Sequence, residues 1–391
     1  MKIGILIDEL APGSAPKVIG QTCKGLEKLG HWCEALVLID AKKGNEVSSV
    51  YSFHLSGVKI KYIFGRRPWW DFKLPGFSFF SLHHFLSFFA APFAVKPKEY
   101  DCIIANGQFA AFAAWGLKLF RGIPYIFYVH CDPCTYTLRK TYSRTWLRFL
   151  YPFIYAFAWL LDASACLGAK ALITSGKLHK ERFCRLSKNT CENLVLGCFS
   201  SEVFTPYNQR EKAILTYDRW DIGNKPDIFL DLLERTDKSV KLKIGGFWYL
   251  ESIKENFLKE IKKRGLGGRV ELLGALDEKM ILELCSKVIL HVHPNQEAFG
   301  MQTLEAAACG ACIIVPAGSG VADLFEHGVH GYFPKEKDLA ELTRCVNLVF
   351  SDLNKAEIMG KRAWEKAKEY NWPNYAKNLE GIIKKWLSQA S

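Results

Sequence analysis

The chain has 391 residues, of which 49% are hydrophobic and 24% are charged. This composition excludes a disordered chain and supplies enough apolar residues for two or three buried cores. The formal net charge of +12 favours an anionic partner, which could be a nucleic acid, an anionic membrane face or a phosphorylated small substrate.

Thirteen cysteines are scattered along the chain. Residues 1–8 have the pattern of a strand and not the charged head and apolar core of a signal peptide. An odd number of cysteines without a secretion signal predicts reduced thiols and a cytoplasmic protein. Cys131 and Cys134 form one CxxC, but no second pair has matching spacing, so we assign it neither a metal nor a redox role.

The first half of the chain alternates short apolar runs with helical patterns. Ile3–Ile7 is the first predicted strand, and a loop containing Gly13 separates it from a helix that ends at Gly30. Further strands are predicted at Ala35–Ile39, Val58–Phe64, Asp101–Ala105, Pro124–His130, Ala171–Ser175 and Asn193–Gly197. Strands separated by helices in this way are typical of a doubly wound parallel sheet.

Two stretches of the first half are unusually apolar. Leu74–Val95 holds seven phenylalanines and no Asp, Glu, Lys or Arg, and Leu150–Leu161 is a shorter run. The first is long enough to span a membrane, but prolines, a glycine and two histidines interrupt it. Both stretches are interpreted either as core helices or as an interfacial surface that touches a membrane. The basic residues flanking such a surface would be Arg66, Arg67, Lys140, Arg144 and Arg148.

A second series of strands follows Pro206. It comprises Ala213–Tyr217, Val240–Ile244, Val270–Leu273, Val288–His293 and Cys312–Val315. The predicted fold class is therefore α/β, with two Rossmann-like doubly wound domains facing across a cleft. We expect the first domain at residues 1–206, the second at 207–370, and a last helix at 371–391 that returns to the first domain.

The most informative segment follows the strand that ends at His293. Gly300 permits a tight turn, and Met301–Ala308 is a strong helix-forming run. The backbone amides of Phe299, Gly300 and Met301 would point at one spot at the start of this helix. Such a spot attracts phosphate, because the amides lack partners within the helix and the helix dipole is positive there.

Two carboxylates, Glu297 and Glu305, flank this predicted anion site, and each can accept hydrogen bonds from sugar hydroxyls. The segment resembles the Glu-x7-Glu motif of family 4 glycosyltransferases, which are retaining enzymes of the GT-B fold. Residues 309–332 and Tyr370-Asn371-Trp372 also resemble that family, densely over the second domain and loosely over the first. The resemblance implies that Glu297 contacts the donor sugar and Glu305 the nucleotide ribose.

The resemblance also implies cations and a glycine at the donor. Arg219 and Lys225 match the family's Arg and Lys, whose charge would stabilise the leaving nucleotide diphosphate. Asp218 stands where the family usually has a glycine, and the spacing from Arg219 to Lys225 is one residue longer than is common. Gly246, in the pair Gly245-Gly246, resembles part of a Gly-x-Gly near the donor.

In the first domain, the resemblance singles out two positions. His130 matches a histidine at a strand end, and it would touch the donor sugar or the reacting centre. Gly13 lies in the loop that faces the donor phosphates in the family, although Pro16 and other residues replace most of the usual glycines there.

Together, these residues predict a hexosyl- or related glycosyltransferase that moves a sugar, with retention, from a nucleotide-diphosphate sugar to a hydroxyl of a glycan or lipid-linked acceptor. No DxD motif lies near the site, so neither a metal nor another cofactor is expected. A non-hydrolysing nucleotide-sugar epimerase and a catalytically silent sugar-nucleotide binding protein remain as alternatives. No motif supports nucleic acid as a partner. The basic, phenylalanine-rich first domain predicts peripheral contact with the inner face of an anionic membrane.

Overall fold

The computed structural model describes residues 1–10, 14–40, 53–65, 81–130, 145–187, 190–221, 223–224, 226–336 and 338–388. Gly13, Lys225 and the pair Cys131 and Cys134 therefore lie outside the described residues. The chain forms two compact units. Unit 1 comprises Met1–Val195 and Trp372–Ser391, and unit 2 comprises Leu196–Asn371. This division falls ahead of Pro206 and places the last helix in unit 1.

Unit 1 is built on a seven-stranded parallel sheet in the order β3-β2-β1-β4-β5-β6-β7. Its strands are β1 (Lys2–Glu9), β2 (Trp32–Ile39), β3 (Ile60–Tyr62), β4 (Cys102–Asn106), β5 (Tyr125–Val129), β6 (Leu172–Thr174) and β7 (Cys191–Asn193). The central strands are buried on both faces and read as continuous apolar runs, as parallel strands covered by helices require.

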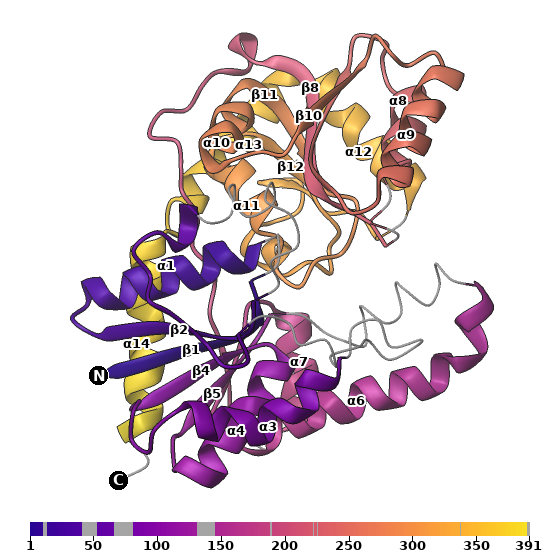
Figure 1. Cartoon of the computed structure of the whole chain (residues 1–391). Coiled ribbons are helices and arrows are strands. Elements are labelled where there is room, and N and C mark those ends of the chain that lie inside the picture. The colour runs from indigo at the N-terminus through magenta and orange to yellow at the C-terminus, as the bar shows by residue number, and fades with distance from the viewer. Residues whose placement is uncertain are drawn as a thin grey trace. The chain divides into compact units, whose positions relative to one another are not determined.

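Helices cover both faces of this sheet (Figure 1). They are α1 (Ser14–Lys28), α3 (Leu82–Ala94), α4 (Gln108–Arg121), α6 (Tyr151–Leu167), α7 (Lys177–Leu186) and α14 (Trp372–Ser388). One face packs under α3, α4 and α6, where Phe127 of β5 lies in one core with alanines of α4 and Ala165 of α6. The next residue, Tyr128, points to the other face, where Thr22 of α1 bonds Tyr375 of α14 at 3.0 Å.

Unit 2 has a six-stranded parallel sheet in the order β10-β9-β8-β11-β12-β13. The strands are β8 (Glu211–Trp220), β9 (Lys241–Trp248), β10 (Val270–Gly274), β11 (Val288–Val292), β12 (Cys312–Ile314) and β13 (Gly331–Tyr332). The helices are α8 (Ile228–Glu234), α9 (Glu251–Lys263), α10 (Glu278–Lys287), α11 (Met301–Ala308), α12 (Leu339–Ser351) and α13 (Leu353–Ala367).

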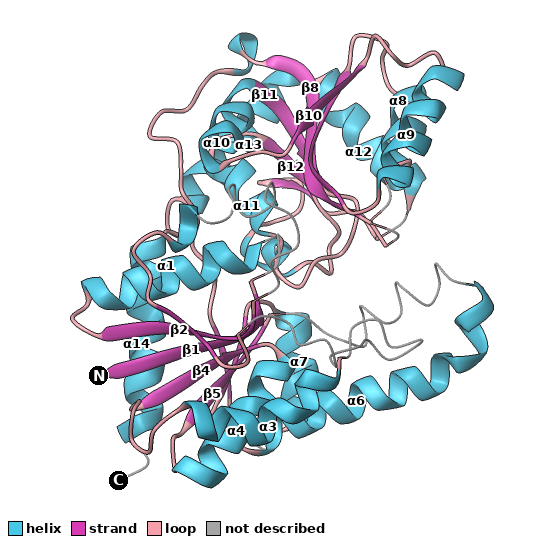
Figure 2. Ribbon diagram, in the orientation of Figure 1, coloured by secondary structure: helices cyan, strands magenta, loops and turns pink. Residues whose placement is uncertain are grey.

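Figure 2 shows helices on both faces of each sheet. The prediction of two Rossmann-like doubly wound domains is therefore confirmed. In unit 2, Asp277, Asp338 and Asp352 cap α10, α12 and α13, because each side chain accepts a hydrogen bond from a backbone N–H of the first turn.

A buried arginine fixes helix α11 in unit 2. The guanidinium of Arg210 donates to the carbonyl of Cys309, just after α11, at 2.9 Å. It also donates to the carbonyls of Cys285 and Val288, each at 3.0 Å, which ties α11 to the end of α10 and the start of β11. A buried charge bonded to backbone carbonyls in this way holds the elements around it in one arrangement.

Two strand boundaries differ from the prediction for physical reasons. β7 ends at Asn193, where the predicted strand begins, because its neighbour β6 has only three residues to pair with it. Leu194 and Leu196 are nevertheless buried, so their apolar character reflects packing and not strand pairing. β8 is longer than predicted and continues through Arg219 and Trp220, which pair with β9.

Both apolar stretches form helices where the structure describes them, as α3 and α6. Among the described residues, one helix, Arg148–Leu167, is long and apolar enough by composition to cross a membrane. Its carboxylate, Asp162, is fully buried and accepts hydrogen bonds from Gln108 at 3.1 Å and Arg182 at 2.6 Å. The helix is therefore attached to unit 1 by a buried polar network.

Candidate active site

Three strands of unit 2 converge at their carboxyl ends. Asp218 and Arg219 of β8 pair with Gly246 and Phe247 of β9. Gly246 has φ of +112°, and a Cβ there would lie 1.9 Å from the carbonyl oxygen of Asp218. Only glycine fits this position, and the absence of a side chain lets the backbones of β8 and β9 contact each other here.

Helix α11 begins next to these strand ends. Gly300 precedes it with φ of +98°, a conformation that L side chains rarely adopt. Phe299 and Met301 are buried on either side of this glycine, and the carbonyl of Phe299 accepts a hydrogen bond from Val321 at 2.7 Å. The first amides of the helix have no intrahelical carbonyl to bind, so this end of α11 can receive an anion.

Glu305 lies one turn into α11 and is 5% exposed. The hydroxyl of Tyr217, near the end of β8, donates to its Oε2 at 3.2 Å and lies 3.2 Å from the carbonyl of Gln302. Tyr217 thereby fixes the carboxylate of Glu305 against the end of β8. Burial raises the pKa of the Tyr217 hydroxyl, so this group remains a donor.

A histidine between two carboxylates completes the edge of the sheet. Nε2 of His293, just after β11, lies 3.3 Å from Oδ2 of Asp218, and Nδ1 contacts the carbonyl of Asn295 at 2.9 Å. Burial alone would lower the pKa of His293, but Asp218 and Glu297 raise it to about 9. The ring is therefore an imidazolium at neutral pH, and the charge of Glu297 has a fixed cation beside it.

The same three side chains are close enough to hold a metal ion, since their ligand atoms lie within 4.8 Å of one another. Nδ1 of His293 contacts the carbonyl of Asn295, so in the neutral ring Nε2 would carry the lone pair that a metal needs. Without a metal, the same three side chains form a charge cluster.

Arg219 lies on β8, two residues beyond the end of the strand predicted at Ala213–Tyr217. Its Nη2 is 3.1 Å from Oδ2 of Asp221, and its side chain is 41% exposed. The other oxygen of Asp221 accepts hydrogen bonds from the amides of Gly223 and Asn224. The guanidinium is thus held by a turn at the strand end with part of its surface open to solvent.

His130 belongs to unit 1, at the carboxyl end of β5. Its Nε2 bonds Oδ1 of Asn106, whose amide nitrogen donates to the carbonyl of Ile104. This orientation of the amide makes Nε2 of His130 the donor and leaves Nδ1 as an acceptor. Burial lowers the pKa of His130 to about 4, so the ring is neutral. It stacks on Tyr128 at 4.2 Å.

A second polar cluster in unit 1 was not predicted. Asp8, near the end of β1, contacts Nε2 of His83 at 2.7 Å and Nε2 of His84 at 2.9 Å. The amide of Ser81 donates to Nδ1 of His84, so His84 presents Nε2–H to Asp8. Burial would raise the pKa of Asp8, but the two imidazoles outweigh it and hold the pKa well below its usual range. Asp8 therefore stays ionised and is held by both imidazoles.

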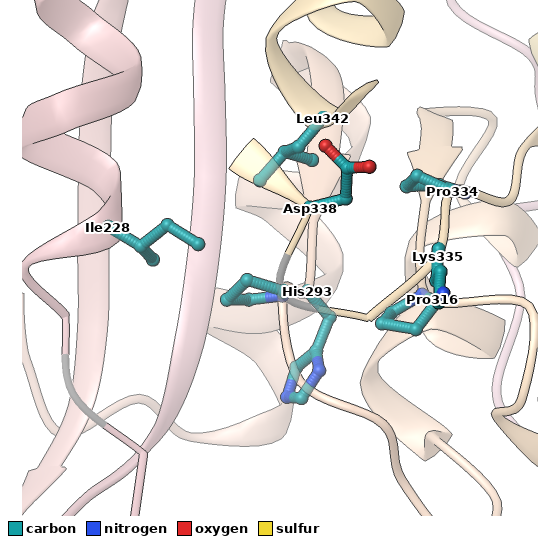
Figure 3. Close-up of a pocket in the computed structure, with 8 residues that line it drawn as sticks. Ile228, His293, Pro316, Pro334, Lys335, Asp338 and Leu342 are labelled. Carbon is teal, nitrogen blue, oxygen red and sulfur yellow. The ribbon is translucent and has the colours of Figure 1, made fainter. Parts of the chain in front are cut away.

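A pocket in unit 2 shares only His293 with these groups. It is lined by Ile228, His293, Pro294, Pro316, Pro334, Lys335, Asp338 and Leu342. In Figure 3, the ring of His293 points away from Asp338 and Leu342. Asp338 also caps α12 by accepting a hydrogen bond from the amide of Glu341 at 2.9 Å. None of the predicted donor residues lines this pocket, so the pocket does not mark their position.

The structure therefore places the predicted residues in two groups. Arg219, Gly246, Glu297, Phe299–Met301 and Glu305 lie around the carboxyl ends of β8, β9 and β11 in unit 2. His130 lies at the corresponding edge of unit 1. The roles of Tyr217 and His293 were not predicted from the sequence. Two signals were available: Tyr217 stands at the end of a predicted strand, and His293 stands at the start of the informative segment.

Comparison with known proteins identifies relatives of this chain. Residues 204–366 match the family described as Glycosyl transferases group 1. The phosphatidylinositol N-acetylglucosaminyltransferase gpi3 subunit of Schizosaccharomyces pombe is 28% identical over 136 residues, which cover 34% of this chain and 28% of that protein. The N,N'-diacetylbacillosaminyl-diphospho-undecaprenol alpha-1,3-N-acetylgalactosaminyltransferase of Campylobacter jejuni is 30% identical over 210 residues, 48% of this chain and 54% of that protein. The matched region thus spans about a quarter to a half of the length of these curated relatives.

Solved structures match the whole chain. The crystal structure of Anabaena Alr3699/HepE in complex with UDP and glucose has a TM-score of 0.73 and 18% identity, and the match covers 98% of this chain and 100% of that one. At this level of identity the similarity establishes the fold, which is the two-domain GT-B fold that the sequence predicted.

Proposed function

Since residues 204–366 belong to the glycosyl transferases group 1 family, we propose that this protein transfers a hexosyl or related sugar from a nucleotide-diphosphate donor to a hydroxyl of an acceptor. The observation that carries the proposal is the meeting of Glu305, held by Tyr217, with the Asp218–His293–Glu297 cluster at the edge where α11 begins. A diphosphate binds backbone amides and cations, whereas sugar hydroxyls bind carboxylates. Both kinds of group lie at this edge of the sheet.

The anionic part of the donor would lie at the start of α11. The amides of Phe299, Gly300 and Met301 and the positive end of the helix dipole favour a phosphate there. Arg219, from β8, and Lys225 would supply the positive charge that the leaving diphosphate requires in the transition state. Gly246 would let the end of β9 lie directly against Asp218 of β8, and so would help to position the strand ends that face the donor.

The polar groups of the donor would bind the two glutamates. Glu305 can accept hydrogen bonds from the two hydroxyls of a ribose while Tyr217 fixes one of its oxygens. Glu297 can accept from sugar hydroxyls while His293 holds its charge in place. In unit 1, His130 offers a neutral Nδ1 that can accept a hydrogen bond from a sugar hydroxyl.

We propose that the reaction proceeds with retention. The acceptor oxygen would attack the anomeric carbon from the face that the diphosphate leaves. The bond from carbon to the leaving oxygen breaks, the new glycosidic bond forms, and the departing phosphate oxygen takes the proton of the acceptor hydroxyl. This scheme needs no protein base and no metal.

The acceptor that we propose is lipid-linked. Two of the curated relatives carry lipids in their names, a phosphatidylinositol in one and an undecaprenol in the other. Unit 1 adds an exposed apolar surface on its own helices. A lipid-linked acceptor would place the protein at the inner face of a membrane.

A thermal-shift panel of UDP, GDP and ADP with their sugars tests the donor part of the proposal. One nucleotide should raise the unfolding temperature in a concentration-dependent way, since a ligand that binds only the folded state stabilises it. Product analysis with and without a lipid-linked acceptor then separates transfer from epimerisation. Stabilisation by none of the nucleotides would overturn the proposal.

A further inference from the structure

The helices on one face of unit 1 expose large apolar side chains. α3, α4 and α6 pack beside one another through the buried core they share with β4 and β5. On their outer side, Phe93 is 86% exposed and Phe153 is 72% exposed, although side chains of this size are ordinarily buried. The outer apolar residues are Phe85, Leu86, Phe89, Phe93, Leu119, Phe120, Phe149, Phe153, Tyr155, Trp159, Leu160 and Leu167. We call this set the apolar face.

The aromatic side chains of this face hold one another in place. Phe88 lies edge-on to Phe89 at 5.0 Å and to Phe120 at 5.9 Å, which joins α3 to α4. The carbonyl of Pro92 accepts a hydrogen bond from Arg121, which joins the ends of the same helices. The part of the face on α3 and α4 is therefore a preformed surface and not a set of isolated apolar side chains.

Basic residues outnumber acidic ones around the apolar face. In α3, α4, α6 and the turn that precedes α6, the basic residues are Lys118, Arg121 and Arg148, and the single acid is Asp162. Asp162 is fully buried and bonded to Gln108 and Arg182, so it presents no charge at the surface. Lys96 and Lys98, which follow α3, are exposed and add to the positive border. Two acids follow them, Glu99, which pairs with Lys61 at 3.1 Å, and the exposed Asp101.

Moving helix α6 out of unit 1 would cost free energy. This cost determines how the helix would meet a membrane. Ile154, Ala158 and Leu161 are buried in unit 1 along one side of the helix. Spanning a bilayer would expose these contacts and carry the ionised carboxylate of Asp162 into hydrocarbon. The helix is instead suited to lie in the plane of an interface, with Phe149, Phe153 and Trp159 directed outward.

We propose that the apolar face is a docking surface for an anionic lipid bilayer. Apolar side chains of α3, α4 and α6 would enter the interfacial layer, and the basic border would contact the lipid headgroups. Charge complementarity selects this occupant over a second copy of the chain, since two copies meeting here would bring like-charged borders together. The inference deepens the proposed function, because a membrane-bound enzyme would meet a lipid-linked acceptor at the surface that carries it.

Co-sedimentation of the full chain with vesicles tests this surface without donor or acceptor. Vesicles of phosphatidylcholine mixed in equal parts with phosphatidylglycerol should bind the chain, and phosphatidylcholine alone should bind it at least about tenfold more weakly at low salt. The double variant Phe93→Ser/Phe153→Ser should lose at least about tenfold in binding to the anionic vesicles. Arg148→Glu with Lys96→Glu should lose a similar factor, and this loss should shrink as salt is added.

Two exposed apolar residues of unit 2 provide a matched control. Val203 is 73% exposed and Ile358 is 55% exposed, so Val203→Ser/Ile358→Ser removes comparable apolar surface away from the face. This variant should bind vesicles as the unaltered chain does. All three variants change exposed side chains, and their unfolding temperatures should match that of the parent.

Several outcomes would overturn the proposed surface. The first is that the Phe93→Ser/Phe153→Ser variant binds anionic vesicles as well as the parent does. The second is that the control variant loses as much vesicle binding as this variant. The third is a concentration-dependent dimer that the phenylalanine substitutions abolish, while the parent binds no vesicles. Nucleotide-induced stabilisation is measured separately in the absence of vesicles. A chain that docks through this face but binds no nucleotide would support the surface and remove the proposed function.

Discussion

Replacing His293 by glutamine should change how the stability of the protein depends on pH. His293 is 2% exposed, beside Asp218 and Glu297, and its pKa in the folded chain is raised to about 9. Glutamine is of similar size and can donate a hydrogen bond, but it carries no charge at any pH. The substitution therefore removes a titrating cation while it retains most of the packing.

The size and the pH window of the effect follow from the two pKa values. In the unfolded chain the pKa of His293 is about 6.5, so the rise to about 9 corresponds to about 3 kcal/mol of folding stability. Because the folded pKa is the higher one, this contribution is fully present below about pH 6.5 and is lost as the pH rises through about 9. The parent should therefore lose up to about 3 kcal/mol over this window relative to His293→Gln.

Urea denaturation of both proteins at a series of pH values across this window measures the difference. His179→Gln is the control: His179 is also buried, but burial lowers its pKa, so it should add no pH dependence above about 6.5. If the parent and His293→Gln gave parallel curves from neutral pH to about 9, the imidazolium between the two carboxylates would be refuted.

Four further predictions concern the site. Glu305→Gln should weaken binding of the nucleotide diphosphate about 10- to 100-fold in calorimetry, because a charge-assisted hydrogen bond becomes a neutral one; an unchanged dissociation constant would remove Glu305 from the donor site. Gly246→Ala should lower the unfolding free energy by about 2–3 kcal/mol, because its Cβ would meet the Asp218 carbonyl at φ +112°, whereas Gly267→Ala, with nothing within 4 Å, should cost little. Turnover should persist in excess EDTA, and a chelated enzyme that regains activity only with a divalent metal would contradict the metal-free scheme. Asp8→Asn should lower the unfolding free energy by about 1–3 kcal/mol, because it removes a carboxylate that bonds both His83 and His84; an unchanged unfolding free energy would contradict this role.

The start of α11 could be predicted to the residue because its signals are local. Gly300 favours a left-handed turn, an alanine-rich run propagates the helix, and Gly310 terminates it, so chain-neighbour effects decide the geometry. The end of β8 could not be predicted in the same way. Arg219 is held in the strand by pairing with β9, and that pairing depends on Gly246, a residue of another strand.

The contact between Asp218 and His293 also lay beyond sequence reasoning. It requires β8 and β11 to be neighbours in the sheet, although β9 and β10 separate them in the chain. A pattern within one segment carries no information on such a crossover. The Asp8 cluster has the same origin, since it joins the end of β1 to the first turn of α3.

The apolar helices show a different limit. Composition identified the stretches that contain α3 and α6 as apolar, but it could not distinguish core helices from a surface. Helical periodicity is weak where nearly all residues are apolar, because both faces look alike. Only the packed structure shows that Phe93 and Phe153 point outward while Ile154 and Ala158 point inward.

A crystal structure with a bound nucleotide-diphosphate sugar tests the central claim most directly. We expect the diphosphate to lie against the amides of Phe299, Gly300 and Met301, the ribose hydroxyls to bind Glu305, and the sugar to lie next to Glu297. A nucleotide bound elsewhere, or a diphosphate without contact to the start of α11, would contradict it.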